Sequence, residues 1–112
     1  GESATKASRT MIRQLEEDQK RRSKRALTDA IDRALIDLLA IYRDVLMVQV
    51  GGDGELINTD LSDLVHEIAQ DSTPRQTLAR VDHIETARKR LVSNGNPLLV
   101  LEDMAISLRP QA

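Results

Sequence analysis

The longest apolar run of the chain covers residues 34–50, and its pattern predicts a helix. It contains neither glycine nor proline, and it ends at Gly51-Gly52. On a helical wheel, one face is centred on Ala34, Leu38, Ile41, Tyr42, Val45 and Val48, and it is widened by Leu35, Leu39 and Leu46. A second, narrower apolar strip holds Ile36, Ala40 and Met47 and shares its side with Arg43. Two apolar strips are typical of a central helix or of one that packs against two partners at once.

Polar, helix-compatible sequence precedes this run without a breaker. We therefore expect one long helix over residues 9–50, solvated in its first half and packed in its second. Three acid-to-base pairs with i,i+4 spacing support the solvated half: Glu16 with Lys20, Glu17 with Arg21, and Asp18 with Arg22. Residues 1–8 are expected to be disordered or derived from cloning, and residues 110–112 to form a tail. The helical domain then spans residues 9–109.

The glycine-rich segment 51–54 predicts the turn that ends the long helix, because glycine readily takes the left-handed conformation found there. Asn58, Thr59 or Asp60 is expected to cap a second helix that ends at Asp71-Ser72. The apolar positions of that helix are Leu61, Leu64, Val65, Ile68 and Ala69, which have regular helical spacing.

Two proline-containing segments predict the start of two further helices. Thr73 is suited to cap the third helix, with Pro74 as its first residue and Gln76 as the capping-box partner. That helix is expected to stop at Asn94-Gly95, and Asn96-Pro97 to begin the last one. No segment shows convincing strand character. The predicted fold class is therefore all-α, a small bundle of four to five helices with one long N-terminal helix.

Composition narrows the functions that this chain can perform. Its 112 residues suit one domain, and its only aromatic residue is Tyr42, so side chains that stack on bases or sugars are lacking. The net charge of -2 argues against a dedicated nucleic-acid binder. The chain has no cysteine, which fits a reducing, cytoplasmic location and rules out disulfides and cysteine-based zinc sites.

Little in the sequence indicates catalysis, a metal or a cofactor. His66 and His83 are typical of solvated helix positions. The segment 51–54 lacks the pattern of a phosphate-binding loop, and no nucleophile motif is present. Charges at Asp37, Arg43 and Asp44 interrupt the long apolar run, so it does not read as a membrane span. We expect a chain that is not an enzyme and that binds no cofactor, metal, membrane or small-molecule ligand.

Two surfaces of the predicted long helix are candidates for function. A subunit interface would use the second apolar strip with polar contacts at its rim: Ile36, Ala40, Arg43, Asp44 and Met47. Both charged residues of that set are expected on the surface. A phosphate contact would use the basic cluster, Arg21, Arg22, Lys24 and Arg25. The alternative for this cluster is a solvated helix surface, neutralised in part by the preceding acidic residues.

Three segments together resemble a known family. They are AIDRALIDLL at residues 30–39, YRDVL at residues 42–46 and NGNPLLVLE at residues 94–102. These segments resemble the C-terminal domain of the delta-prime subunit family of bacterial DNA polymerase III, of the actinobacterial type. The resemblance covers roughly Met11 to Arg109. Ile41 departs from the pattern, because the family often has an aromatic residue there.

The resemblance implies a helical collar domain of a clamp loader. In that family, a ring of collars holds the AAA+ ATPase modules together, and the loader places the sliding clamp on primed DNA. The implied partners are the other clamp-loader subunits, gamma/tau and delta, with DNA contacted only indirectly. The nucleotide-binding and zinc-binding parts of such subunits lie upstream of the collar, so neither ATP nor zinc is expected here. Two alternatives stay open: a gamma/tau-type collar, and a nucleic-acid-binding module built on the basic helix.

Overall fold

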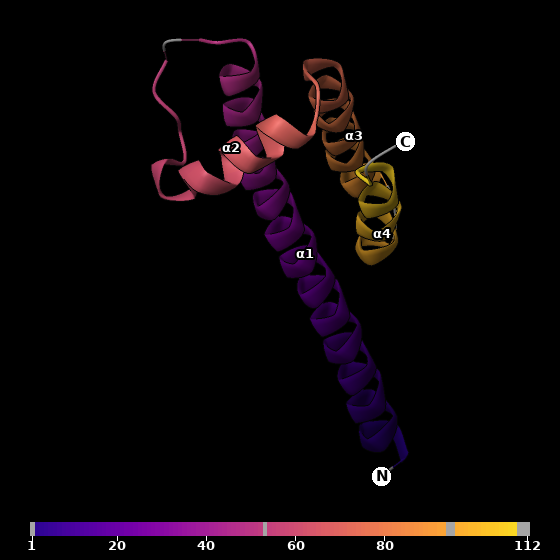
Figure 1. Ribbon diagram of the computed structural model, residues 1–112. Helices are drawn as coiled ribbons and strands as arrows, with labels where there is room; N and C mark the ends of the chain where they lie inside the picture. Colours follow the sequence, from indigo (N-terminus) through magenta and orange to yellow (C-terminus); the bar gives the residue numbers. More distant parts are fainter. Residues whose placement is uncertain (1, 53, 94–95, 110–112) are drawn as a thin grey trace.

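The computed structural model describes residues 2–52, 54–93 and 96–109, and it consists of helices joined by short connections (Figure 1). The elements in chain order are α1 (Glu2–Gln49), the 3-10 helix η1 (Thr59–Leu61), α2 (Ser62–Asp71), α3 (Pro74–Ser93) and α4 (Pro97–Ser107). No strand occurs among the described residues. The all-α prediction with one long N-terminal helix is confirmed.

Helix α1 determines the shape of the molecule. Its 48 residues correspond to a rod of about 72 Å, and the molecule measures 76 × 29 × 18 Å. The helix begins at Glu2, earlier than the expected start at residue 9, and it ends at Gln49. Figure 1 shows that its N-terminal half extends alone, whereas α2, α3 and α4 gather around its C-terminal half. Residues 2–30 are called the lone half of α1 below, and residues 31–49 the packed half.

The core lies where α2, α3 and α4 pack on the C-terminal half of α1. Its buried apolar side chains are Ile31, Leu35, Val45, Val65, Ile84, Ala87, Leu91, Val100 and Met104. Full burial of such an aliphatic side chain stabilises the fold by about 1.5–3 kcal/mol. Ala34, predicted near the centre of the packed face, is instead exposed. The packed face is centred closer to Ile31 and Leu35, because α3 approaches α1 from that side.

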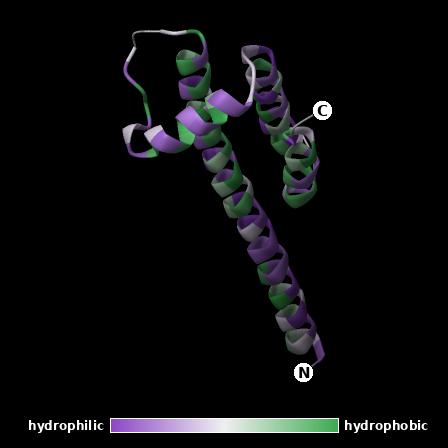
Figure 2. Ribbon diagram, in the orientation of Figure 1, coloured by the Kyte–Doolittle hydropathy of each residue, from purple (hydrophilic) through white to green (hydrophobic). Residues whose placement is uncertain are grey.

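Hydropathy follows the same division. Figure 2 shows apolar residues gathered where the helices meet and more hydrophilic residues along the N-terminal half of α1. That half still carries exposed apolar side chains at Met11, Ile12 and Leu15. Among the described residues, no helix carries an apolar stretch long enough to cross a lipid bilayer.

The end of α1 is closed by a glycine, as predicted. Gly51 has a positive φ of 70°, and its amide donates to the carbonyl oxygen of Val48 at 3.2 Å. The amide of Gly52 donates to the carbonyl oxygen of Met47 at 3.0 Å. This pair of hydrogen bonds is the Schellman motif, which satisfies carbonyl groups left open at a helix end.

The predicted caps of α3 and α4 are confirmed. The Thr73 amide donates to the Gln76 side chain at 2.9 Å, and the Gln76 amide donates to the Thr73 hydroxyl at 3.2 Å. The Asn96 side chain accepts a hydrogen bond from the Leu99 amide, with Pro97 in the first turn of α4. The predicted stop at Asn94-Gly95 lies outside the described residues.

The predicted cap of the second helix is wrong. Asn58 precedes η1 but makes no side-chain cap, and Leu61 occupies the position before α2. The Asn58 side chain instead donates to the carboxylate of Asp44 on α1. A long-range polar contact has replaced the local cap.

One polar residue at the end of α1 ties three helices together. The side-chain nitrogen Nε2 of Gln49 donates to the Ala69 carbonyl oxygen at 3.3 Å and to the Ser72 carbonyl oxygen at 3.0 Å. Gln49 Oε1 of the same side chain accepts a hydrogen bond of 2.7 Å from the Thr77 hydroxyl. Thr77 is fully buried, and its hydroxyl is satisfied by Gln49 and by the Thr73 carbonyl oxygen at 3.2 Å. The C-terminal end of α1 is thereby fixed against both α2 and α3.

Candidate subunit interface

The second apolar strip of α1 lies on the surface of the packed half. Ile36 is 45% exposed and Met47 is 37% exposed, although their neighbours Leu35 and Val45 are buried. Ala40 is half-buried and Arg43 is exposed. The spacing of the four residues places them on one face of the helix. Four of the five predicted interface residues therefore form a surface strip on a rigid support.

Met47 is partly covered by the turn that follows α1. A Cβ atom added at Gly54 would lie 3.3 Å from the Met47 methyl group, and one added at Gly52 would collide with the Met47 sulfur. The glycine turn therefore folds closely over this side chain. Ile36, which lies farther from the turn on the same strip, presents the larger exposed fraction.

Asp44 differs from its prediction as a surface charge at the rim of an interface. The side chain is only 2% exposed. Its two carboxylate oxygens accept hydrogen bonds of 2.8 Å each from the amides of Ile57 and Asn58, and one of 3.1 Å from the Asn58 side chain. The carboxylate thus anchors the connection between α1 and α2 to the body of α1. It is not part of the exposed strip.

The protonation of Asp44 follows from these contacts. Burial raises the pKa of the carboxyl group, but the hydrogen bonds from Ile57 and Asn58 outweigh burial and leave the pKa below its ordinary value of 3.8. Asp44 is therefore charged at neutral pH. A buried carboxylate that accepts several hydrogen bonds is a strong anchor, because protonation would break part of the network.

Two side-chain contacts join α1 to α3 next to the strip. Arg88 Nε donates to Asp32 Oδ1 at 2.8 Å, and a second guanidinium nitrogen lies 3.3 Å from Oδ2. Hydrogen bonding to Arg88 lowers the pKa of Asp32 despite partial burial. The Arg80 guanidinium carbon lies 5.8 Å from the centre of the Tyr42 ring, at cation–π distance. Both contacts involve the face of α1 turned toward α3.

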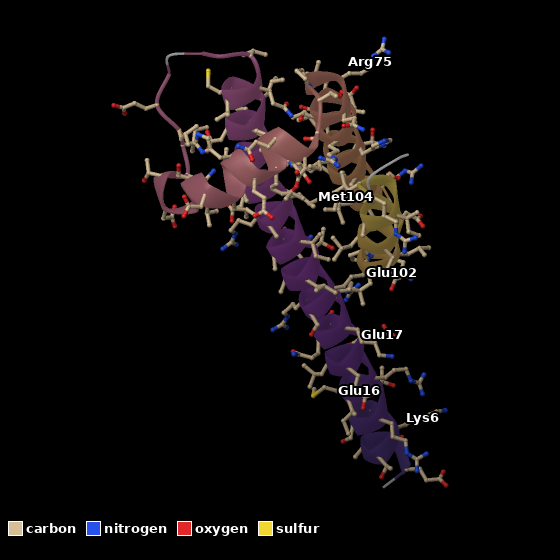
Figure 3. All side chains as sticks on the ribbon, viewed as in Figure 1. Lys6, Glu16, Glu17, Arg75, Glu102 and Met104 are labelled. Atoms are coloured by element: carbon tan, nitrogen blue, oxygen red, sulfur yellow. The ribbon has the colours of Figure 1, made fainter. Side chains whose placement is uncertain are left out.

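The basic cluster lies on the part of α1 that no other element covers. Arg21, Arg22, Lys24 and Arg25 are all exposed. The predicted i,i+4 pairs are wrong, since the ion pair present among the described residues of this segment joins Asp18 to Arg21 at i,i+3. Exposed pairs contribute little energy, so their geometry is weakly determined. Figure 3 shows Glu16 and Glu17 projecting from this lone part of the helix.

The two histidines lie on different helices and do not meet other metal-ligating side chains. His66 Nδ1 is 2.7 Å from the carbonyl oxygen of Ser62 within α2. His83 is exposed on α3. Across residues 2–52, 54–93 and 96–109, no group of three acidic or histidine residues has metal-binding geometry.

The sequence pattern missed the residues that position this surface. Asp44, Gln49 and Thr77 are polar residues whose partners lie between 13 and 28 positions away along the chain. Asp32 and Arg88 are 56 positions apart. Of these residues, only Asp44 could have been identified from the sequence. A charged residue at the edge of a wide apolar face is a candidate for burial with hydrogen-bond partners.

The chain is similar in sequence to a family model and to a curated relative. A family model described as "DNA polymerase III, delta subunit, C terminal" matches residues 5–109. The DNA polymerase III subunit delta' of Bacillus subtilis (strain 168) is 36% identical over 72 residues. That match covers 64% of this chain and 22% of the relative, so the chain corresponds to a small part of the relative's length. No solved structure matches the chain significantly.

Proposed function

Because the chain belongs to the family formed by the C-terminal domain of the DNA polymerase III delta subunit, we propose that it is the assembly domain of a delta-prime-type subunit in a clamp loader. In this role it would join the collar ring and so support ATP-dependent loading of the sliding clamp during DNA replication. Its partners would be the gamma/tau and delta subunits in the cytoplasm. The role is structural, since the ATPase modules belong to other parts of the assembly.

The exposed strip on α1 is the observation that carries this proposal. Ile36, Ala40, Arg43 and Met47 combine apolar surface with one charge, which suits an interface with a polar edge. The strip lies on the half of α1 that packs against α2, α3 and α4. A rigid support lowers the entropic cost of binding, because few side chains and no backbone must be ordered.

The delta-prime relative favours a delta-prime-type subunit over a gamma/tau-type collar. The family description names the delta subunit, and the relative is named delta'. Both names refer to DNA polymerase III, which supports a role for this chain in that complex. Binding experiments with one clamp-loader subunit at a time would identify which subunit contacts each helix.

Co-purification tests the assembly role directly. The chain is mixed with the remaining clamp-loader subunits, and the product is analysed by size-exclusion chromatography with light scattering. We expect a hetero-complex of defined mass. If the chain elutes alone while circular dichroism shows it to be helical, the assembly role is wrong.

Single substitutions then test the strip itself. Met47→Asp places a charge in the strip and should weaken assembly. The matched control is Met11→Asp, because Met11 is an exposed methionine on the lone half of the same helix. Normal assembly of the Met47→Asp variant would move the interface to another helix.

A second candidate function, direct contact with DNA phosphates, is favoured by the charge of the lone half of α1. Arg22, Lys24 and Arg25 have no ion pair with another described residue. Together with Arg21, they would supply a sequence-independent contact whose affinity falls steeply with salt.

Duplex binding in a salt series tests this second function. The triple variant Arg22→Gln/Lys24→Gln/Arg25→Gln should lose affinity and show a shallower salt dependence. The control is Arg33→Gln/Lys89→Gln/Arg90→Gln, which also removes three positive charges, but from exposed positions outside the basic cluster. Equal losses in both variants would indicate a general charge effect and contradict a specific contact.

A further inference from the structure

A cavity between the first half of α3 and the end of α4 is lined by positive charge. Its volume is ≈ 250 Å³, and its walls include Arg75, Gln76, Arg80, His83, Ser107 and Arg109. No carboxylate lines it among the described residues. The cavity lies apart from the strip and from the basic cluster on α1, so the proposed assembly role does not account for it.

The three guanidinium groups are available to a ligand. None of Arg75, Arg80 and Arg109 makes an ion pair with another described residue. Arg80 is half-buried and held over the Tyr42 ring, so its position is fixed before any ligand arrives. Arg75 and Arg109 are exposed, and Figure 3 shows the Arg75 side chain extended away from the start of α3. One arginine is therefore preorganised, and two are free to close on an anion.

The backbone adds a smaller contribution. Arg75 and Gln76 lie in the first turn of α3, where the helix dipole is positive. The end of α4 at Ser107 contributes the opposite partial charge. The two helix ends oppose each other, so the positive potential of the cavity comes mainly from the guanidinium groups.

We propose that this cavity binds a phosphate group. Guanidinium forks match the oxygens of a phosphate, and several of them suit its double negative charge. A single carboxylate would leave most of that positive charge uncompensated. The volume is below the about 300–1,000 Å³ usual for a whole small-molecule ligand, so the cavity takes the phosphate rather than a complete nucleotide. The source is either a small phosphate compound or the phosphorylated end of a nucleic acid.

Nuclear magnetic resonance titration of the ¹⁵N-labelled chain with inorganic phosphate tests the site. We expect shifts at the amides of Gln76, His83 and Ser107. The double variant Arg75→Gln/Arg109→Gln should bind at least about tenfold more weakly, since it loses charged hydrogen bonds. Arg80 is left in place because it also stacks on Tyr42. Arg33→Gln, at an exposed arginine of α1, is the control and should bind normally.

A phosphorylated oligonucleotide distinguishes the two sources of the phosphate, and a glutamate-rich peptide tests whether the cavity prefers carboxylates. Binding of a 5′-phosphorylated oligonucleotide that is tighter than that of inorganic phosphate and of the unphosphorylated oligonucleotide indicates a nucleic-acid end. Equal binding of inorganic phosphate and the phosphorylated oligonucleotide indicates a small phosphate compound. Unchanged phosphate affinity in the double variant, or an equal loss in Arg33→Gln, would overturn the proposal. Stronger binding of a glutamate-rich peptide than of phosphate would overturn it as well.

Discussion

The two halves of α1 have the same secondary structure but different surroundings. From Ile31 to Gln49 the helix packs against α2, α3 and α4, and Leu35 is only 2% exposed. From Glu2 to Ala30 every residue is exposed or half-buried, and Leu15 is 58% exposed. The first half therefore depends on intrinsic helix propensity and local contacts, whereas the second half is stabilised by tertiary packing.

This difference shows how a helix surface can be divided between folding and binding. In the packed half, adjacent residues face different ways, so Leu35 fills the core while Ile36 remains on the surface. Tertiary packing stabilises that surface before any partner arrives. The lone half offers charge and a few apolar side chains but has no support from other elements.

The largest contrast is expected from leucine substitutions in the two halves. Leu35→Ala leaves a cavity in the core and should lower the free energy of unfolding by about 2–5 kcal/mol. Leu15→Ala removes an exposed side chain and should change it by less than about 0.5 kcal/mol. Urea denaturation followed by circular dichroism measures both. Equal effects would mean that the lone half shares in the cooperative core.

Removing the Asp44 carboxylate should give the next largest effect. Asp44→Ala leaves the amides of Ile57 and Asn58 without their acceptor and should cost about 1–3 kcal/mol, measured by urea denaturation. Because the folded-state pKa lies below 3.8, the stabilisation is present above pH 4 and is lost as the pH falls through the folded-state pKa. Asp44→Asn should remove this part of the acid sensitivity. An unchanged acid transition in Asp44→Asn would show that another carboxylate controls it.

A smaller loss of stability is expected from substituting the glycine that ends the packed half of α1. Gly51 has a φ of 70°, so Gly51→Ala should destabilise the fold by about 1–2 kcal/mol in thermal denaturation. Space is not the cause, since nothing lies within 4 Å of the added Cβ atom. Gly54→Ala is the control, because Gly54 has no positive φ and its Cβ would meet only the flexible end of Met47. A larger loss from Gly54→Ala would contradict the role given to Gly51.

The smallest effect on stability is expected from the ion pair near the boundary between the two halves of α1. Asp32 pairs with Arg88 in two-pronged geometry, but both side chains are at least a third exposed. A double-mutant cycle with Asp32→Asn and Arg88→Gln should give a coupling energy of about 0.2–1 kcal/mol that shrinks in salt. A coupling above that range would mark the pair as a main determinant of how α3 docks.

The sequence predicted the features that depend on neighbouring residues. The Thr73–Gln76 capping box, the Asn96-Pro97 start and the left-handed Gly51 need only local geometry, and each was predicted. Helical spacing also gave Val65 as an apolar position of the second helix, and this side chain is fully buried. These features are local, so an isolated sequence pattern contains them.

The features that were missed depend on contacts between distant segments. Asp44 was predicted at the surface, because its partners at Ile57 and Asn58 come from a connection whose path a helical wheel does not describe. The same contact drew Asn58 away from the predicted cap. The helical wheel did predict the strip of Ile36, Ala40, Arg43 and Met47, because which side of a packed helix faces outward follows from its periodicity. Asp44 is the predicted interface residue that does not belong to this strip.

The most direct test of the account uses Ile36, which lies beside a core leucine and is itself 45% exposed. The dissociation constant for the partner clamp-loader subunits is measured for Ile36→Asp and for wild type, with urea denaturation in parallel. We predict at least about tenfold weaker association, or about 1.4 kcal/mol, with the free energy of unfolding changed by less than about 0.5 kcal/mol. Unchanged association of a folded Ile36→Asp variant would contradict an assembly surface on this strip of α1.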